Sequence, residues 1–176
     1  MKTVYLALGS NLGDRAGNIA RAIEALGARG VRVTRRSSLY ETEPVNVRGG
    51  SWFLNCVAEA ETDLMPRQLL QALLGIERSL GRRRKPHMEE GEGPREPRVI
   101  DMDILLFGSS VVRAPGLEIP HPRMAERRFV LMPLAEIAPE ARHPVLQQTV
   151  AQLLADTPDG SQVRLWHGAG GTATPG

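Results

Sequence analysis

The sequence has little cysteine, few aromatic residues and no long apolar run. Cys56 is its single cysteine, so no disulfide forms within the chain, as is usual for a protein of a reducing compartment. Aromatic residues make up 4% of the chain, too few to favour an RNA-binding sheet with exposed stacking rings. Neither an apolar stretch of about 18 residues nor a signal-peptide core is present. We therefore expect a cytoplasmic protein with no membrane segment.

Lysine is also scarce, since Lys2 and Lys85 are the only two and arginine carries most of the basic charge. The formal net charge is only +2, which gives no reason to expect a nucleic-acid partner. Apolar residues make up 41% and charged residues 24%, the mixture of a globular domain. We expect one domain over residues 1–167 and a flexible Gly/Ala/Thr/Pro tail over residues 168–176.

The first 60 residues show alternating strand and helix signals. Residues 3–8 are apolar on both faces, as in a central strand, and end at a turn whose Asp14 is a good helix N-cap. Ile19, Ile23 and Leu26 then recur at helical spacing. Residues 31–41 and 52–60 predict a second and a third strand.

A second helix is predicted after residue 62, with Thr62 or Asp63 as its cap and Pro66 in its first turn. Gly81 ends it, and residues 82–96 are polar and without periodicity, as in a long mobile loop. Residues 99–107 predict a strand, which a hairpin through residues 108–110 continues to residues 111–112.

The remaining chain adds smaller pieces to this pattern. Residues 120–144 are punctuated by proline, residues 150–154 predict a short helix and residues 163–166 predict a last strand. The order of the larger elements predicts an α+β fold, a ferredoxin-like β-α-β-β-α-β sandwich with a mainly antiparallel sheet, helices packed on it and C-terminal additions.

Two carboxylates, Asp101 and Asp103, interrupt an apolar strand. Strand side chains alternate, so both carboxylates share one face, about 7 Å apart, and require nearby positive charge. Two Mg²⁺ ions would supply it and would suit phosphoryl transfer, whereas neighbouring arginines would supply it as plain salt bridges. Both interpretations stay open at this point. The other face of the strand is expected to carry Ile100, Met102, Ile104 and Leu106.

Cationic side chains surround this pair in the sequence. Arg98 precedes it by three residues, and a run from Arg82 to Lys85 follows the second helix. Arginine forks match phosphate oxygens, although such a run also stabilises a helix end without any ligand. His121, held between two prolines, suits either a structural role or a phosphate contact. The turn at residues 9–13 lacks the P-loop lysine, so a structural turn is favoured over a phosphate cradle.

Taken together, these motifs resemble one family, the 6-hydroxymethyl-7,8-dihydropterin pyrophosphokinases of folate biosynthesis. The resemblance extends to about Trp166. It is carried, in order, by Ala7-Leu8-Gly9-Ser10-Asn11-Leu12-Gly13, Phe53-Leu54-Asn55, Ile76-Glu77 with Gly81-Arg82-Arg83-Arg84, Arg98-x-x-Asp101-x-Asp103-Ile104-Leu105-Leu106-Phe107-Gly108, Ile119-Pro120-His121-Pro122 and Arg127-x-Phe129-x-Leu131-x-Pro133-Leu134.

The resemblance implies transfer of the diphosphoryl group of ATP to the hydroxymethyl oxygen of the pterin, with release of AMP. It implies that Asp101 and Asp103 hold two Mg²⁺ and that Arg82 and Arg84 are catalytic. The implied ATP-binding residues are Glu77, Arg84, Arg98, His121 and Arg127. The implied pterin-binding residues are Thr42, Glu43, Val45, Phe53, Asn55 and Phe129. Only these small molecules are implied as partners, and we expect a monomer.

The chain departs from the family pattern before the Asp pair. Where members often carry Trp-Gly-Pro-Arg, this sequence has Arg95-Glu96-Pro97-Arg98, so either Arg95 or Arg98 is the expected phosphate ligand. Two other functions fit a ferredoxin-like scaffold with these residues. One is a different two-metal nucleotidyl or phosphoryl transferase, which would not bind the pterin, and the other is a non-catalytic RNA-binding module using residues 82–85 as a basic patch.

Overall fold

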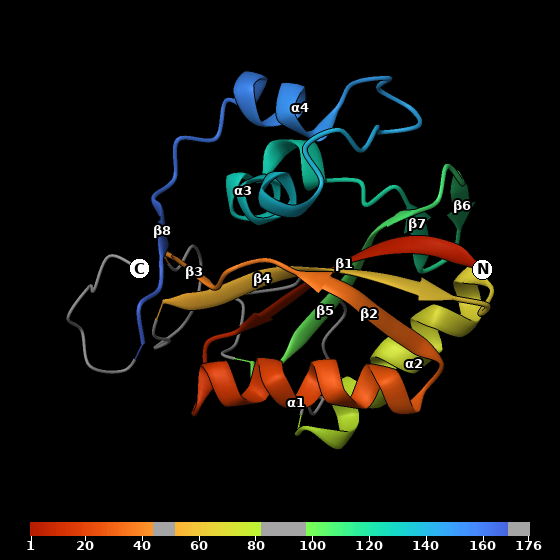
Figure 1. The fold of residues 1–176 in the computed structure, drawn as a ribbon, viewed down its shortest axis with the longest axis vertical. Coiled ribbons are helices and arrows are strands. Elements are labelled where there is room, and N and C mark those ends of the chain that lie inside the picture. Colours follow the sequence, from red (N-terminus) through yellow and green to blue (C-terminus); the bar gives the residue numbers. More distant parts are fainter. Residues whose placement is uncertain (44–51, 82–97, 169–176) are drawn as a thin grey trace.

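A six-stranded antiparallel sheet forms the centre of the molecule in the computed structural model, which describes residues 1–43, 52–81 and 98–168. The strands follow the order β5-β1-β4-β3-β8, and β2 also pairs with β4 (Figure 1). The sheet strands are β1 (Lys2–Ser10), β2 (Val31–Arg36), β3 (Tyr40–Thr42), β4 (Phe53–Thr62), β5 (Asp101–Phe107) and β8 (Val163–Leu165).

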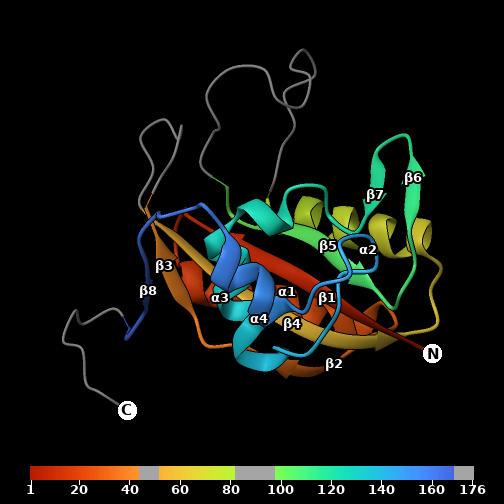
Figure 2. The same cartoon turned by 90° about the horizontal axis from the view of Figure 1, so that it is seen from above.

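Helices cover both faces of this sheet. In Figure 1, α1 (Arg15–Ala28) and α2 (Pro66–Ser79) lie below it, and α3 (Arg128–Ile137) and α4 (Val150–Asp156) lie above it. The order β1-α1-β2-β4-α2-β5 and the antiparallel pairing confirm the predicted ferredoxin-like fold. The C-terminal additions, α3, α4 and β8, close the second face and extend one edge (Figure 2).

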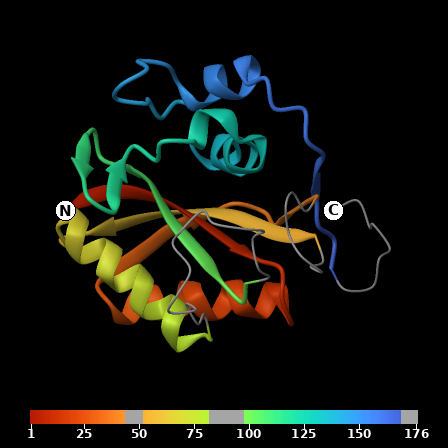
Figure 3. The same cartoon turned by 180° about the vertical axis from the view of Figure 1, so that it is seen from behind.

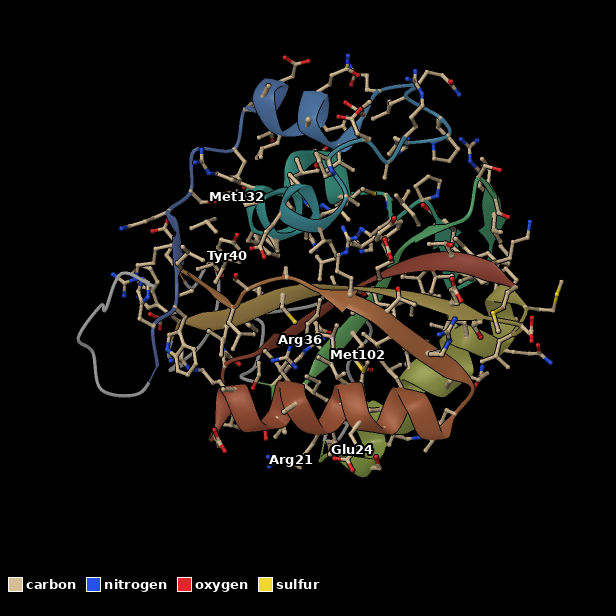
Figure 4. All side chains as sticks on the ribbon, viewed as in Figure 1. Arg21, Glu24, Arg36, Tyr40, Met102 and Met132 are labelled. Atoms are coloured by element: carbon tan, nitrogen blue, oxygen red, sulfur yellow. The ribbon has the colours of Figure 1, made fainter. Side chains whose placement is uncertain are left out.

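Two apolar clusters hold these layers together because alternate strand residues point to opposite faces. Leu6 and Leu8 of β1 pack in the first cluster with Leu73 and Ile76 of α2. Leu134 of α3 belongs to the second cluster, on the other face of the sheet. Figure 4 shows Met102 on the side of α1 and α2 and Tyr40 on the side of α3.

The prediction of one continuous strand over residues 31–41 is wrong, because two separate strands, β2 and β3, occupy that part of the chain. The Ser37 amide donates to the Val57 carbonyl, and the Ser37 hydroxyl accepts a hydrogen bond from the Val57 amide. A side chain thus replaces a backbone carbonyl in the ladder, and the backbone leaves regular strand geometry there. β3 then resumes pairing with β4 from Tyr40.

Helix α1 begins where the sequence predicts, with the Asp14 carboxylate accepting a hydrogen bond from the Gly17 amide at 3.1 Å. The predicted cap of α2 is wrong. Met65 is the N-cap residue, and its amide donates to Gln68 Oε1 at 2.8 Å. Thr62 instead ends β4 and donates to the Gly30 carbonyl, because the sheet extends to that residue.

The connection after β5 also differs from the prediction. Strand β6 (Val112–Ala114) pairs with β7 (Leu117–Ile119) in a separate hairpin, instead of continuing a hairpin with β5 (Figure 3). The expected direction of Leu106 is wrong as well. The pairing of β5 with β1 shifts between Tyr5 and Leu6, so Leu105 and Leu106 both pack in the cluster beneath α3.

Helix α3 was not predicted, because Pro133 lies inside it and a proline normally ends a helix. A short 3-10 helix, Met124–Glu126, precedes α3. Val130, Leu134 and Ile137 are buried on one side of α3 and pack on the sheet. This burial of the apolar stripe outweighs the lost backbone hydrogen bond. The predicted elements at residues 150–154 and 163–166 are confirmed as α4 and β8.

Candidate active site

One row of residues crosses the sheet at the end where the site motifs meet. Asp101 of β5 pairs with Gly9 of β1, Gly9 pairs with Asn55 of β4, and Asn55 pairs with Tyr40 of β3. Residues paired in this way share one face. Since neighbouring strands are about 4.8 Å apart, Asp101 and Asn55 stand roughly 10 Å apart with only a glycine between them.

Asp101 and Asp103 lie on the face of the sheet covered by α3. Asp103 pairs with Ala7, which packs with the second apolar cluster, whereas Met102 between them is buried in the first. Small residues, Gly9 and Ala7, therefore stand beside the carboxylates on β1. The Asp103 side chain is 42% exposed and the Asp101 side chain 17% exposed. The expected placement of both carboxylates on one face is confirmed.

Arg98 forms the ion pair that the simpler interpretation of the Asp pair requires. Its Nη1 donates to Asp101 Oδ1 at 3.0 Å. Asn11 fixes the Arg98 backbone through two hydrogen bonds. The side-chain Oδ1 of Asn11 accepts from the Arg98 backbone amide at 2.7 Å, and the backbone amide of Asn11 donates to the Arg98 carbonyl at 3.1 Å. Residues just after β1 thus hold the start of β5, a structural role for that turn.

The turn differs from the prediction in one respect. Gly9 and Ser10 belong to β1, so the strand runs two residues beyond the predicted end at residue 8. An ideal Cβ at Gly9 would lie 2.7 Å from Asn55 Oδ1. Only a residue without a side chain leaves the Asn55 amide in place. The sequence pattern does not predict this requirement, because it depends on a neighbour 46 positions away.

His121 lies beside Asp103, with 4.0 Å between Nε2 and Asp103 Oδ1. The Arg123 amide donates to His121 Nδ1, which leaves the proton of the neutral ring on Nε2. The pKa of His121 is lowered to about 4, mainly by burial and also by the positive charges of Arg127 and Arg123, while Asp101 opposes the shift. His121 is therefore a neutral hydrogen-bond donor at pH 7.

Glu77 lies behind β5, on α2. Its side chain is buried, and Oε2 accepts a hydrogen bond from the Met102 amide at 2.8 Å. Met102 stands between the two site carboxylates on an edge strand, so Glu77 fixes the backbone that carries them. A nucleotide contact of Glu77 stays a prediction.

A second group of predicted residues meets across β3 and β4. Asn55 Nδ2 donates to Thr42 Oγ1 at 2.8 Å, and both side chains are buried. Thr42 also pairs with Phe53. The Arg127 guanidinium lies 5.6 Å from the centre of the Phe129 ring at the start of α3. The structure thus brings an amide, a hydroxyl and aromatic rings to the same end of the molecule as the carboxylates.

Some predicted residues cannot be placed. Val45, Arg82, Arg84 and the alternative phosphate ligand Arg95 lie outside the described residues, as does most of the predicted tail and the predicted loop over residues 82–96. The predicted pterin residue Glu43 is described, and its Oε1 accepts a hydrogen bond from the Gln162 amide at 3.0 Å. Sequence patterns gave no signal for this contact with the C-terminal part of the chain.

The described ranges contain no group of three or more His, Cys, Asp or Glu side chains placed to hold a metal ion. Two carboxylates nevertheless fit Mg²⁺, which commonly takes one or two from the protein and completes its shell with water and substrate phosphates. In the same ranges, no helix has both the length and the apolar character that a membrane crossing needs.

A groove of about 330 Å³ adjoins the site at His121. Residues of the β6–β7 hairpin and Val145 and Leu146 form much of its wall, and His143 also lines it. Neither site carboxylate belongs to its lining. The groove therefore meets the site at His121 and not at the carboxylates.

Known proteins are similar in sequence to this chain over most of its length. The chain is 40% identical over 163 residues to the 2-amino-4-hydroxy-6-hydroxymethyldihydropteridine pyrophosphokinase of Bacillus subtilis, covering 92% of this chain and 89% of that protein. It is 45% identical over 141 residues to the protein of the same name from Methylorubrum extorquens, with coverage of 80% and 85%. Both relatives are matched over more than four fifths of their own length.

Longer proteins contain a region similar to this chain. It is 41% identical over 150 residues to the folic acid synthesis protein fol1 of Pneumocystis carinii, covering 85% of this chain and 19% of that protein. The chain thus spans about a fifth of the length of this relative, and a similar share of the Dictyostelium discoideum protein FOL1.

The fold is also found in solved structures. Wild-type HPPK-DHPS of Plasmodium falciparum superposes with a TM-score of 0.67 at 17% identity, covering 88% of this chain and 44% of that one. Residues 5–139 match the family model described as 7,8-dihydro-6-hydroxymethylpterin-pyrophosphokinase. This chain belongs to the 7,8-dihydro-6-hydroxymethylpterin-pyrophosphokinase family.

Proposed function

We propose that this chain transfers the diphosphoryl group of ATP to 6-hydroxymethyl-7,8-dihydropterin in folate biosynthesis. The hydroxymethyl oxygen forms a bond to the β-phosphorus, the bond from that phosphorus to the oxygen of the α-phosphate breaks, and AMP leaves while the hydroxyl proton is released. The observation that carries the proposal is the row Asp101–Gly9–Asn55, which sets a carboxylate and a buried amide on one face within the family-matched residues.

The pterin is assigned to the side of Asn55. A planar heterocycle with donors and acceptors along its edge suits an amide and a hydroxyl set beside aromatic rings. The Asn55–Thr42 hydrogen bond holds the side-chain amide of Asn55 in one defined direction. The proposed pterin-binding residues are Thr42, Glu43, Val45, Phe53, Asn55 and Phe129.

The triphosphate is assigned to the side of β5. Arg98, already directed at Asp101, and Arg127 bring positive charge, and neutral His121 offers its Nε2 proton to an anionic oxygen. Diphosphoryl transfer needs positioning and charge neutralisation more than covalent catalysis. Glu77 completes the described nucleotide group, and Arg82 and Arg84 are proposed as further phosphate ligands by the resemblance alone.

Asp101 and Asp103 are the proposed ligands of two Mg²⁺. The fit rests on hard oxygen donors that share one face beside Gly9 and Ala7, with the Asp103 carboxylate accessible. Magnesium bound there neutralises charge on the triphosphate. The Arg98–Asp101 ion pair is compatible with this role, because a guanidinium beside the carboxylate can neutralise phosphate at the same place.

The test is a product analysis. Purified protein is mixed with Mg²⁺, ATP and 6-hydroxymethyl-7,8-dihydropterin, and the nucleotides are separated with time. AMP that forms only in the presence of the pterin, in equal amount to pterin diphosphate, is the expected result. ADP as the product would contradict diphosphoryl transfer, and turnover without the pterin would favour another two-metal transferase.

A further inference from the structure

The C-terminal segment, residues 159–165, lies beyond the family-matched residues 5–139 and yet contacts the proposed pterin side at several points. Asp159 Oδ2 accepts a hydrogen bond from the Arg128 amide at 2.8 Å, at the first turn of α3. Strand β8 then pairs with β3, with Val163 opposite Thr42 and Arg164 opposite Glu41. Figure 1 shows the segment descending from the α4 layer to the edge of the sheet at β3.

Arg164 makes two contacts at that edge. Its Nη2 lies 3.5 Å from Glu41 Oε1, and its guanidinium lies 4.2 Å from the centre of the Trp52 ring. Glu41 stands next to Thr42, and Trp52 stands next to Phe53. One side chain of the C-terminal segment therefore joins the strand that carries Thr42 to Trp52, the residue just before the strand that begins at Phe53.

A second arginine completes the same cluster from below the sheet. Arg15 of α1 donates through Nη1 to Glu41 Oε2 at 2.9 Å and to the Trp52 carbonyl at 2.8 Å. Glu41 alternates along β3 with Tyr40 and Thr42, so it faces α1 while Thr42 faces the proposed pterin. The cluster thus lies on the face of the sheet opposite Thr42 and supports the proposed binding face from behind.

Strand β3 needs this support because it has only three residues. Without β8 it would be the outer strand of the sheet beyond β4, with one row of unpaired backbone groups. Pairing with β8 satisfies those backbone groups. The Glu41 side chain, which is only 18% exposed, also links β3 to α1 through Arg15 and to β8 through Arg164.

We propose that Arg164 is a positioning residue for pterin binding: through Glu41 and Trp52 it fixes the spacing of Thr42, Phe53 and Asn55. This inference rests on the proposed function. It predicts a selective effect, because ATP is assigned to β5 at the opposite edge of the sheet. Loss of Arg164 weakens binding of the pterin and leaves the chemical step and ATP binding in place.

The experiment compares Arg164→Gln and Arg164→Lys with a matched control, Arg32→Gln. Arg32 also forms an ion pair across neighbouring strands of this sheet, with Glu61, far from Trp52. Steady-state assays give KM for pterin, KM for ATP and kcat. In a Trp166→Phe background, the emission of Trp52 reports whether the guanidinium still covers its ring.

For Arg164→Gln we expect KM for the pterin to rise about fivefold, the combined effect of losing an exposed ion pair and a cation–π contact. KM for ATP and kcat should stay within about twofold, as for a surface substitution. Arg164→Lys should recover part of the pterin affinity, because the charge remains while the planar stack is lost. Arg32→Gln should match the parent protein in all three constants.

An unchanged KM for the pterin in Arg164→Gln, or an equal rise in both KM values, would overturn the positioning role. If Arg164→Gln does not fold, the ratio of the two KM values in Arg164→Lys decides the same question. A parent protein that makes no AMP from the pterin and ATP would contradict the proposed function instead, so the two failures are distinguishable.

Discussion

The two edges of the sheet are protected in different ways. At the β5 edge, within the described residues, the Glu77 side chain of α2 accepts from the Met102 amide and the His121 backbone amide donates to the Leu105 carbonyl. At the other edge a whole strand, β8, pairs with β3. Isolated contacts of this kind protect single backbone groups, whereas a strand protects an entire row. Among the described residues, the edge assigned to charged phosphates and metal is held by isolated contacts, and the edge assigned to a flat ring is held by a paired strand.

The same contrast exists in sequence distance. Arg98, Asp101 and Asp103 are neighbours in the chain, and a short segment places all three. The proposed pterin side joins β3, β4, α3 and residues 159–165, which lie far apart in the sequence. Changes at β5 should therefore affect chemistry with little change in stability, and changes at the other edge should affect binding through distant partners.

The largest effect is expected at the carboxylates. Asp101→Asn and Asp103→Asn should each lower kcat/KM by about a thousandfold or more, because several kcal/mol of metal-assisted charge neutralisation is lost. Asp63→Asn is the control, since the Asp63 side chain is 79% exposed and forms an ion pair with the N-terminal amine of the chain. Activity assays over a range of Mg²⁺ concentrations check this. Variants that keep parental activity would refute the metal assignment.

Gly9→Ala should break the row between the two edges. The added Cβ would lie 2.7 Å from Asn55 Oδ1, so the Asn55 side-chain amide must move. We therefore expect KM for the pterin to rise about tenfold, which corresponds to the roughly 1–3 kcal/mol that an overpacked site costs. Gly27→Ala in α1 is the matched control, because nothing lies within 4 Å of its Cβ. Equal KM values in the two variants would contradict the packing argument.

Glu77→Ala tests the side-chain protection of the β5 edge. It leaves the Met102 amide without its buried acceptor, which should lower the free energy of unfolding by about 1–3 kcal/mol. Glu77→Gln keeps an acceptor oxygen and should cost less. Denaturant unfolding measures both, with exposed Glu24→Ala on α1 as control (Figure 4). Faster hydrogen exchange at Met102 is expected only in the Ala variant.

The smallest effect is expected at Asp159. Partial burial acts to raise its pKa, but hydrogen bonds from Ser161 and from the Arg128 amide outweigh burial, and the pKa of Asp159 is lowered. A lowered pKa in the folded state means that the ionised carboxylate stabilises the protein above the ordinary Asp pKa of about 4, and that this stabilisation is lost as the pH falls through the folded-state pKa.

Asp159→Asn should therefore lower the free energy of unfolding at pH 7 by about 0.5 kcal/mol, the effect of a solvent-screened carboxylate at a helix N-terminus. The difference between parent and variant should shrink as the pH falls below about 4. Unfolding curves at several pH values measure this difference. A gap that stays constant down to pH 2 would show that ionisation of Asp159 contributes nothing.

Local patterns predicted most of the fold. Asp14 and the spacing of Ile19, Ile23 and Leu26 predicted α1, and Leu73 and Ile76 belong to the predicted stripe of α2. The strand pattern of β5 placed both carboxylates on one face. These predictions succeeded because each depends on residues within one or two turns or on simple alternation.

The failures share a different cause. No helix was predicted in the proline-punctuated residues 120–144, yet burial against the sheet keeps α3 there with Pro133 inside it. Thr62 was expected as a helix cap, yet pairing with β1 and β2 extends β4 to it. Leu106 was expected beside Met102, yet a shift in register opposite β1 moves it to the other face. In each case a partner distant in sequence outweighed the local preference.

The sequence by itself determined the family, the ferredoxin-like order of elements and the carboxylate pair, because motifs and periodicity are local properties of the chain. Only the tertiary structure decided that Gly9 makes room for Asn55, that Glu77 binds the β5 backbone and that Arg164 contacts Glu41 of β3. Those contacts join residues whose separation along the chain carries no pattern, and they exist only once sheet pairing sets the register.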